Sequence, residues 1–69
     1  MAEDRKTVSA PGRDIYIEFL VQGALIKTTA IDSVTGTEVC IFGPRTTPRE
    51  ILIKNAVAKL QYVQAKNKT

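Results

Sequence analysis

A short segment after the middle of the chain separates a strand-forming part of the sequence from a helix-forming part. Gly43-Pro44 ends any preceding strand, because proline lacks the backbone donor that a sheet ladder needs. Thr47-Pro48-Arg49-Glu50 then combines three signals of a helix start: a capping hydroxyl, a proline at the first helical position and a glutamate three residues after the cap. We therefore expect one helix that begins here and continues to about Lys66.

The expected helix carries an apolar stripe on one side. At about 100° per residue, its apolar side chains fall on an arc of roughly 140°, which is typical of a helix that packs on a sheet. The members of this arc are Leu52, Ile53, Ala56, Val57, Leu60 and Val63. A weaker stripe on the opposite side consists of Ile51, Ala58, Tyr62 and Ala65. It is either ordinary helix composition or a contact for a second copy of the chain.

Three segments before the helix have the composition of strands. Ile15–Val21 alternates side chains of two faces, Ala24–Ile31 is rich in β-branched residues, and Thr37–Phe42 follows a turn-forming segment around Gly36. A two-residue turn at Gln22-Gly23 then places Phe19 opposite Ile26. The apolar side chains of the first two segments thereby gather on one face.

The charged residues fit the same register. It places Glu18 opposite Lys27, where opposite charges across two strands stabilise the pairing by about 0.2 to 1 kcal/mol. In the next hairpin, pairing of Asp32 with Thr37 brings Ala30 opposite Val39. We therefore expect a continuous apolar face across three antiparallel strands.

The predicted fold class is α+β. A three-stranded antiparallel β-meander is packed on one face by the single C-terminal helix, in the order βββα. Residues 1–12 are polar, show no periodicity and end in a Pro-Gly pair, so we expect a disordered N-terminal tail there. Residues 13–66 form the single expected domain, and residues 67–69 are expected to fray.

One helix covers one face of such a sheet, so the other face meets solvent or a partner. In the expected register this face carries six apolar or aromatic side chains: Tyr16, Leu20, Leu25, Ile31, Cys40 and Phe42. A solvent face is normally mostly polar, and an apolar patch of a few hundred Å² suggests a binding surface. The alternative is that loops and the tail cover part of it. We name Tyr16, Leu20, Leu25 and Phe42 as the candidate interface.

Several chemistries lack the residues they require. The chain has no histidine and one cysteine, so an internal disulfide, a Cys/His zinc site and a Ser-His-Asp or Cys-His nucleophile are excluded. The glycine spacing matches neither phosphate-binding loop. We therefore expect no enzymatic activity, no cofactor and no metal site. The favoured interpretation is a small non-enzymatic protein-interaction module, which uses its open sheet face either to self-associate as a homodimer or to bind an unidentified protein partner.

The alternative function is nucleic-acid binding. Ten Lys and Arg against seven Asp and Glu give a net charge of +3, and most of the positive charge lies in the helical third. The candidate contacts are Arg45, Arg49, Lys54 and Lys59, with Tyr16 and Phe42 available for base stacking. Lysines at spacings of five and seven are also ordinary solubilising residues, which makes this the weaker interpretation.

The sequence carries no membrane or export signal. Its apolar runs are far shorter than the roughly 20 residues of a membrane helix, and its charged start does not fit a secretory signal. A single cysteine fits a reducing compartment, so we expect a cytoplasmic protein.

Several segments together resemble a known family. The chain contains Ala30-Ile31-Asp32, Thr35-Gly36-Thr37-Glu38-Val39 and Lys59-Leu60-Gln61-Tyr62-Val63. Over residues 14–66 it resembles a family of very small alphaproteobacterial proteins with no assigned activity. The resemblance implies a bacterial cytoplasmic protein, and it carries no functional role onto any residue.

Overall fold

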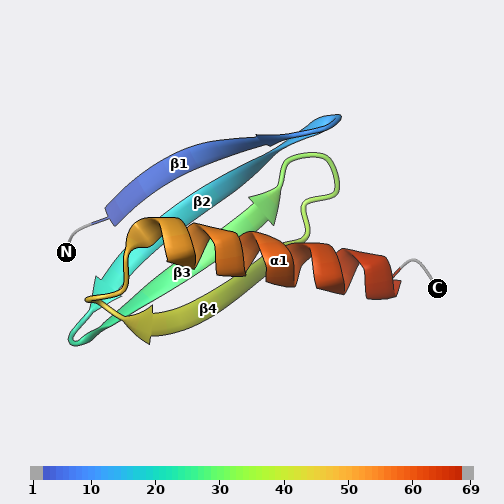
Figure 1. The fold of residues 1–69 in the computed structure, drawn as a ribbon. Coiled ribbons are helices and arrows are strands. Elements are labelled where there is room, and N and C mark those ends of the chain that lie inside the picture. Colours follow the sequence, from blue (N-terminus) through green and yellow to red (C-terminus); the bar gives the residue numbers. More distant parts are fainter. Residues whose placement is uncertain (1–2, 68–69) are drawn as a thin grey trace.

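An antiparallel sheet with one helix across one of its faces makes up the molecule (Figure 1). The structure, a computed structural model, describes residues 3–67. The elements follow one another as β1 (Glu3–Ala10), β2 (Arg13–Gln22), β3 (Leu25–Asp32), β4 (Glu38–Pro44) and α1 (Arg49–Asn67). The strands lie in the sheet in the order in which they occur in the chain. The expected α+β class and C-terminal helix are confirmed.

The sheet has four strands, so the expectation of three is wrong. Residues 3–10, which fall in the expected tail, form β1 and pair with β2. Pro11 and Gly12 make the connecting turn, in which Gly12 has a φ of 80°. Proline followed by a glycine of positive φ is the composition of a type II turn. Met1 and Ala2 of the predicted tail, and Lys68 and Thr69 of the predicted fraying end, lie outside the described residues.

The sequence pattern missed β1 because this strand has almost no apolar alternation. Its only apolar side chains before the turn are Val8 and Ala10, and both pack against the core while remaining partly exposed. Its pairing is defined by the tight turn and by the backbone ladder to β2. A hydrophobic pattern cannot reveal a strand of this kind.

The register of β2 with β3 differs from the expected one by two residues. The turn is formed by Gly23-Ala24, so Phe19 lies opposite Thr28 and not Ile26. Gly23 occupies the first turn position with a φ of 61°, as in a type II′ hairpin turn, whereas Gln22 still belongs to the strand. Because the shift is even, the same side chains face the core.

The charged pair expected across this hairpin is also wrong. Glu18 lies opposite Thr29, and Lys27 lies opposite Leu20. The cationic partner of Glu18 comes instead from β1, where Arg5 lies directly across from it, with Nε at 3.4 Å from the carboxylate. By contrast, the register of β3 with β4 is confirmed: Ala30 lies opposite Val39.

The core lies between the sheet and α1, which packs mainly on β3 and β4 (Figure 1). The expected arc of the helix supplies three buried residues and three half-buried ones. Its buried members are Leu52, Ala56 and Leu60, and from the sheet they meet Ile15, Ile17, Phe19, Ile26, Ala30 and Val39. Gly43 allows the close approach of α1, because a Cβ at this position would lie 3.2 Å from Leu52 Cδ2.

Within residues 3–67, no helix is long and apolar enough to cross a membrane.

Candidate functional site

The face of the sheet that points away from α1 displays the predicted interface residues. Alternation along β2 turns Ile15, Ile17 and Phe19 toward the helix, and therefore turns Tyr16 and Leu20 to the other side. Tyr16 is 45% exposed, Leu25 46% and Phe42 56%. Leu20 is half-buried among its neighbours. All four candidates thus lie on this open face.

The open face contains two apolar clusters. Lys27 separates Leu20 from Phe42 in one cross-strand row, and Leu25 lies diagonal to both at the end of the β2–β3 hairpin. We call Leu20, Leu25 and Phe42 the hairpin cluster. The second cluster is the directly opposed pair Tyr16 and Ile31. The structure therefore places Tyr16 apart from the other three candidates.

A polar row runs between the two clusters. It consists of Arg5, Glu18 and Thr29 on β1, β2 and β3, and it ends on β4 at Cys40, the one apolar member of the row. Thr29 is only 7% exposed although no helix covers this face, because its neighbours on the sheet surround it. Beside this row the surface has a hollow of about 360 Å³, lined by Arg5, Lys6, Thr7, Tyr16, Ile17, Glu18 and Ile31. The open face is therefore divided into apolar and polar regions, and it is hollowed beside the polar row.

The nucleic-acid candidates differ in how far they are engaged within the protein. Arg49 is half-buried, with its guanidinium 4.7 Å from the centre of the Phe19 ring. Lys59 donates to the carbonyl of Cys40 at 3.0 Å, and Arg45 donates to that of Gly23 at 3.3 Å. Lys54 is exposed on the helix. Three of the four candidates therefore contact groups of the protein itself.

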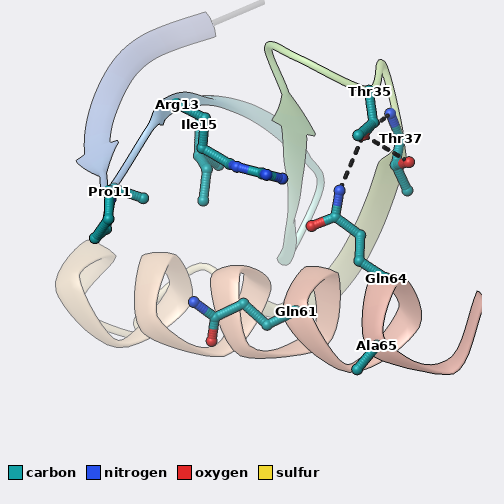
Figure 2. A pocket seen from close by; sticks show the side chains of 9 residues that line it. Pro11, Arg13, Ile15, Thr35, Thr37, Gln61, Gln64 and Ala65 are labelled. Carbon is teal, nitrogen blue, oxygen red and sulfur yellow. Dashed lines mark hydrogen bonds between the residues drawn. The ribbon is translucent and has the colours of Figure 1, made fainter. Parts of the chain in front are cut away.

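A cavity of about 420 Å³ opens at the C-terminal end of α1 (Figure 2). Its walls come from the β1–β2 turn, the start of β2, the β3–β4 loop and the last turns of the helix. The lining residues are Ala10, Pro11, Arg13, Ile15, Thr35, Thr37, Gln61, Gln64 and Ala65. In Figure 2 the side chains of Arg13 and Gln64 point toward each other across it. Sequence reasoning gave no indication of this cavity.

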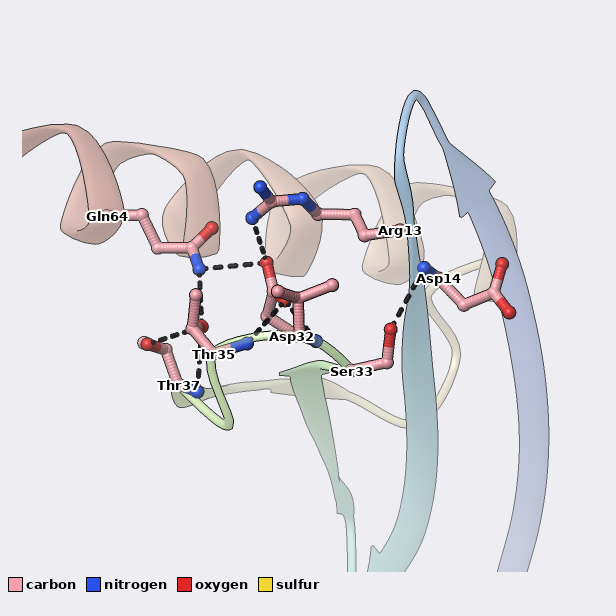
Figure 3. Close-up of polar contacts among 8 residues, drawn as sticks. Arg13, Asp14, Asp32, Ser33, Thr35, Thr37 and Gln64 are labelled. Atoms are coloured by element: carbon pink, nitrogen blue, oxygen red, sulfur yellow. Dashed lines mark hydrogen bonds and ion pairs between the residues drawn. The ribbon is translucent and has the colours of Figure 1, made fainter.

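A fully buried carboxylate, Asp32, lies behind these two side chains (Figure 3). Its Oδ2 accepts hydrogen bonds from Arg13 and, at 2.9 Å, from Gln64. Its Oδ1 accepts from the backbone N–H groups of Val34, at 2.7 Å, and Thr35, at 3.1 Å. A buried charge is tolerated only when it is paired and hydrogen-bonded, and Asp32 meets both conditions.

These contacts also determine the acidity of Asp32. The hydrogen bond from Gln64 is the largest influence and holds the pKa of Asp32 well below its ordinary value. Burial acts in the opposite direction, and the bonds from Thr35, Arg13 and Val34 add to the lowering. Asp32 is therefore an ionised structural group. Asp32 lies on the helix-facing side of β3, where the alternation of the strand predicts an apolar residue. This departure from the alternation is the sequence signal that could have identified Asp32.

Within residues 3–67, no three His, Cys, Asp or Glu side chains are grouped so as to hold a metal ion.

A family model described as a domain of unknown function (DUF6898) matches residues 12–67. No curated protein and no solved structure matches the chain.

Proposed function

Because the chain belongs to the DUF6898 family, which carries no assigned function, we propose its function from the surface that it displays. The protein is a small non-enzymatic interaction module that associates with a second copy of itself through the open face of the sheet. The reducing environment that suits its single cysteine, Cys40, favours the cytoplasm as its location.

The exposure of Tyr16, Leu25 and Phe42 on one face carries this proposal. Each keeps close to half or more of its surface in contact with water, whereas a solvent-facing sheet surface is normally mostly polar. Large apolar side chains gathered on one face, rather than scattered singly, are typical of an interaction surface. Because each of these side chains is already about half buried, burying the rest of one stabilises an association by about 1 kcal/mol before the costs of binding.

A second copy suits this face because the face carries both signs of charge. Arg5 and Lys27 are accompanied there by Glu18 and Glu38, so two identical faces bring together opposite charges as well as apolar clusters. Four strands about 4.8 Å apart, with 7 to 10 residues each and hence roughly 27 Å long on average, present about 500 Å² of flat area per copy. Stable complexes bury about 800 Å² per partner, so we expect a reversible dimer.

Sedimentation equilibrium at several protein concentrations tests the proposal. The wild-type protein should show a mass that rises from monomer toward dimer. Phe42→Glu should remain monomeric and folded, because it places a charge in the hairpin cluster. Tyr62→Glu is the matched control, since Tyr62 is an exposed aromatic residue, 65% accessible, on the outer side of α1.

Three results would contradict the proposal. The wild-type protein could stay monomeric at every concentration, or Phe42→Glu could associate as the wild type does. If only Tyr62→Glu lost the ability to associate, the contact between two copies would lie on the side of α1 that carries Ile51, Ala58, Tyr62 and Ala65. Unfolding of Phe42→Glu would require a milder variant, Phe42→Ser, before the comparison is made.

Nucleic-acid binding is the weaker alternative, because Arg45, Arg49 and Lys59 are engaged within the protein. Titration of the protein with a short duplex DNA and a single-stranded RNA separates the two functions. A salt-dependent complex that weakens in Lys54→Ala would favour the alternative.

A further inference from the structure

The cavity at the C-terminal end of α1 contains polar groups that the fold uses only in part. Its volume of about 420 Å³ is within the range of small-molecule sites. Asp32 lies behind it, fully buried, and each of its two carboxylate oxygens already accepts two hydrogen bonds. A ligand in the cavity therefore meets the side chains that donate to Asp32 and not the carboxylate itself.

Arg13 keeps hydrogen-bond donors available to such a ligand. Its guanidinium has five N–H donors, and the one hydrogen bond that it makes within residues 3–67 is from Nη1 to Asp32. The side chain is 35% exposed, and Figure 2 shows it extending across the cavity. Because the buried carboxylate fixes the guanidinium, its other N–H groups are donors of defined position.

Gln64 supplies an acceptor beside these donors. Its Nε2 donates to Asp32 and to Thr35 Oγ1, at 2.9 Å each, and these two bonds fix the orientation of the amide. Figure 2 shows Oε1 turned toward the cavity, and no residue in the described part of the chain donates to this oxygen. Arg13 and Gln64 both donate to the same atom, Asp32 Oδ2, so the guanidinium and the amide lie side by side.

The charges around the cavity favour a neutral ligand. The positive charge of Arg13 is already balanced by Asp32, and the cavity lies at the carbonyl end of α1, where the helix dipole disfavours an anion. None of the described residues that line the cavity is acidic, so a cation finds no counter-charge there. The rest of the wall includes apolar side chains: Ala10, Pro11, Ile15 and Ala65.

We propose that this cavity binds a small neutral molecule that carries a primary carboxamide on an apolar body. The carbonyl oxygen of the ligand accepts from Arg13, and its N–H group donates to Gln64 Oε1. Its apolar body lies against Ala10, Pro11 and Ala65. A primary carboxamide presents an acceptor and a donor on one edge, which matches the neighbouring guanidinium and amide. The site is separate from the open face and does not depend on self-association.

Titration of the isotope-labelled full chain with benzamide, followed by NMR, tests the proposal. We expect saturable binding, with shifts at the side-chain N–H groups of Arg13 and Gln64. Acetophenone is the matched control, because a methyl group replaces the amide nitrogen in a molecule of the same shape. It should bind about five-fold more weakly, since it leaves Gln64 Oε1 without a donor. Benzoate should also bind more weakly than benzamide, because Asp32 already balances the charge of Arg13.

Two variants test the location of the site. Ala65→Trp should abolish binding by filling the cavity, whereas Ala58→Trp, on the outer side of the same helix, should leave it unchanged. Both alanines are exposed, so neither substitution disturbs the core.

The proposal is wrong if benzamide does not bind, or if acetophenone or benzoate binds as tightly as benzamide. It is also wrong if Ala65→Trp binds as the wild type does, if Ala58→Trp weakens binding equally, or if the shifts lie at Leu20 and Leu25 on the open face. Repeating the titration with Phe42→Glu keeps these outcomes distinct from any effect of self-association.

Discussion

The side-chain amide of Gln64, in the last turns of α1, donates a hydrogen bond of 2.9 Å to the buried carboxylate of Asp32 at the end of β3. The same amide donates to Thr35 Oγ1 at 2.9 Å, and Thr35 in turn bonds Thr37. Arg13 at the start of β2 completes the group. The end of the helix, the β3–β4 loop and the β1–β2 hairpin are therefore joined at one carboxylate.

Loss of this carboxylate should destabilise the protein strongly. Asp32→Ala leaves the guanidinium of Arg13 and the N–H groups of Val34 and Thr35 without their acceptor. We expect the melting temperature to fall by roughly 10 °C. Asp14→Ala is the control, because Asp14 is exposed and contacts Ser33 through its backbone. Equal melting temperatures for the two variants would show that the buried network does not stabilise the fold.

The stability of the protein should fall in acid because of Asp32. Its pKa is lowered in the folded state, first by Gln64, so the ionised form stabilises the fold at every pH above the unfolded value of about 3.9. That stabilisation is lost as the pH falls below about 4 toward the folded pKa. Urea unfolding between pH 7 and pH 2 should show a steeper loss for the wild type than for Asp32→Asn. An equal loss of stability in the wild type and in Asp32→Asn as the pH falls would show that Asp32 is not the cause of the acid sensitivity.

Gln64 should matter more than its neighbour Gln61, although both line the same cavity. Gln64→Ala removes two hydrogen bonds of 2.9 Å, to Asp32 and to Thr35, and should lower the free energy of unfolding by about 1 kcal/mol. It should also raise the pKa of Asp32, which NMR titration of the carboxyl measures. Gln61 is exposed, and Gln61→Ala should change neither quantity. A reversed order of the two variants would be incompatible with the network.

The turn at Gly23 provides a test of the observed register. Its φ of 61° is unfavourable for other residues, although a Cβ at this position would meet no other part of the described chain within 4 Å. Gly23→Ala should therefore cost about 1 kcal/mol through backbone strain alone. Gly23→Asn should cost less, because asparagine tolerates this conformation better. Equal stability of wild type and Gly23→Ala, measured by urea unfolding, would argue for a different turn.

The helix and the β3–β4 hairpin were predictable because their signals are local. A capping segment precedes α1, a single apolar arc lies along it, and Gly36 with its neighbours closes the hairpin at the expected pair Asp32 and Thr37. The β2–β3 register was less predictable, because a shift by two residues preserves the apolar face and only the φ of Gly23 distinguishes the two turns.

β1 and the Asp32 network were not predictable from periodicity. β1 has apolar side chains against the core only at Val8 and Ala10, too few to form a recognisable pattern, and its pairing with β2 determines its structure. The helix-facing position of Asp32 on β3 marks it as unusual in the sequence, but its donors Arg13 and Gln64 lie 19 and 32 positions away, and no pattern links them to it. Contacts at such separations emerge only when the fold brings them together.

An NMR dilution series of the methyl groups tests self-association through the open face most directly. The account predicts concentration-dependent shifts at Leu20, Leu25 and Ile31 on that face, and constant shifts at the buried Leu60 on the helix side of the sheet. Shifts confined to Ile51 on the outer side of α1, or no shifts at any methyl group, would contradict it.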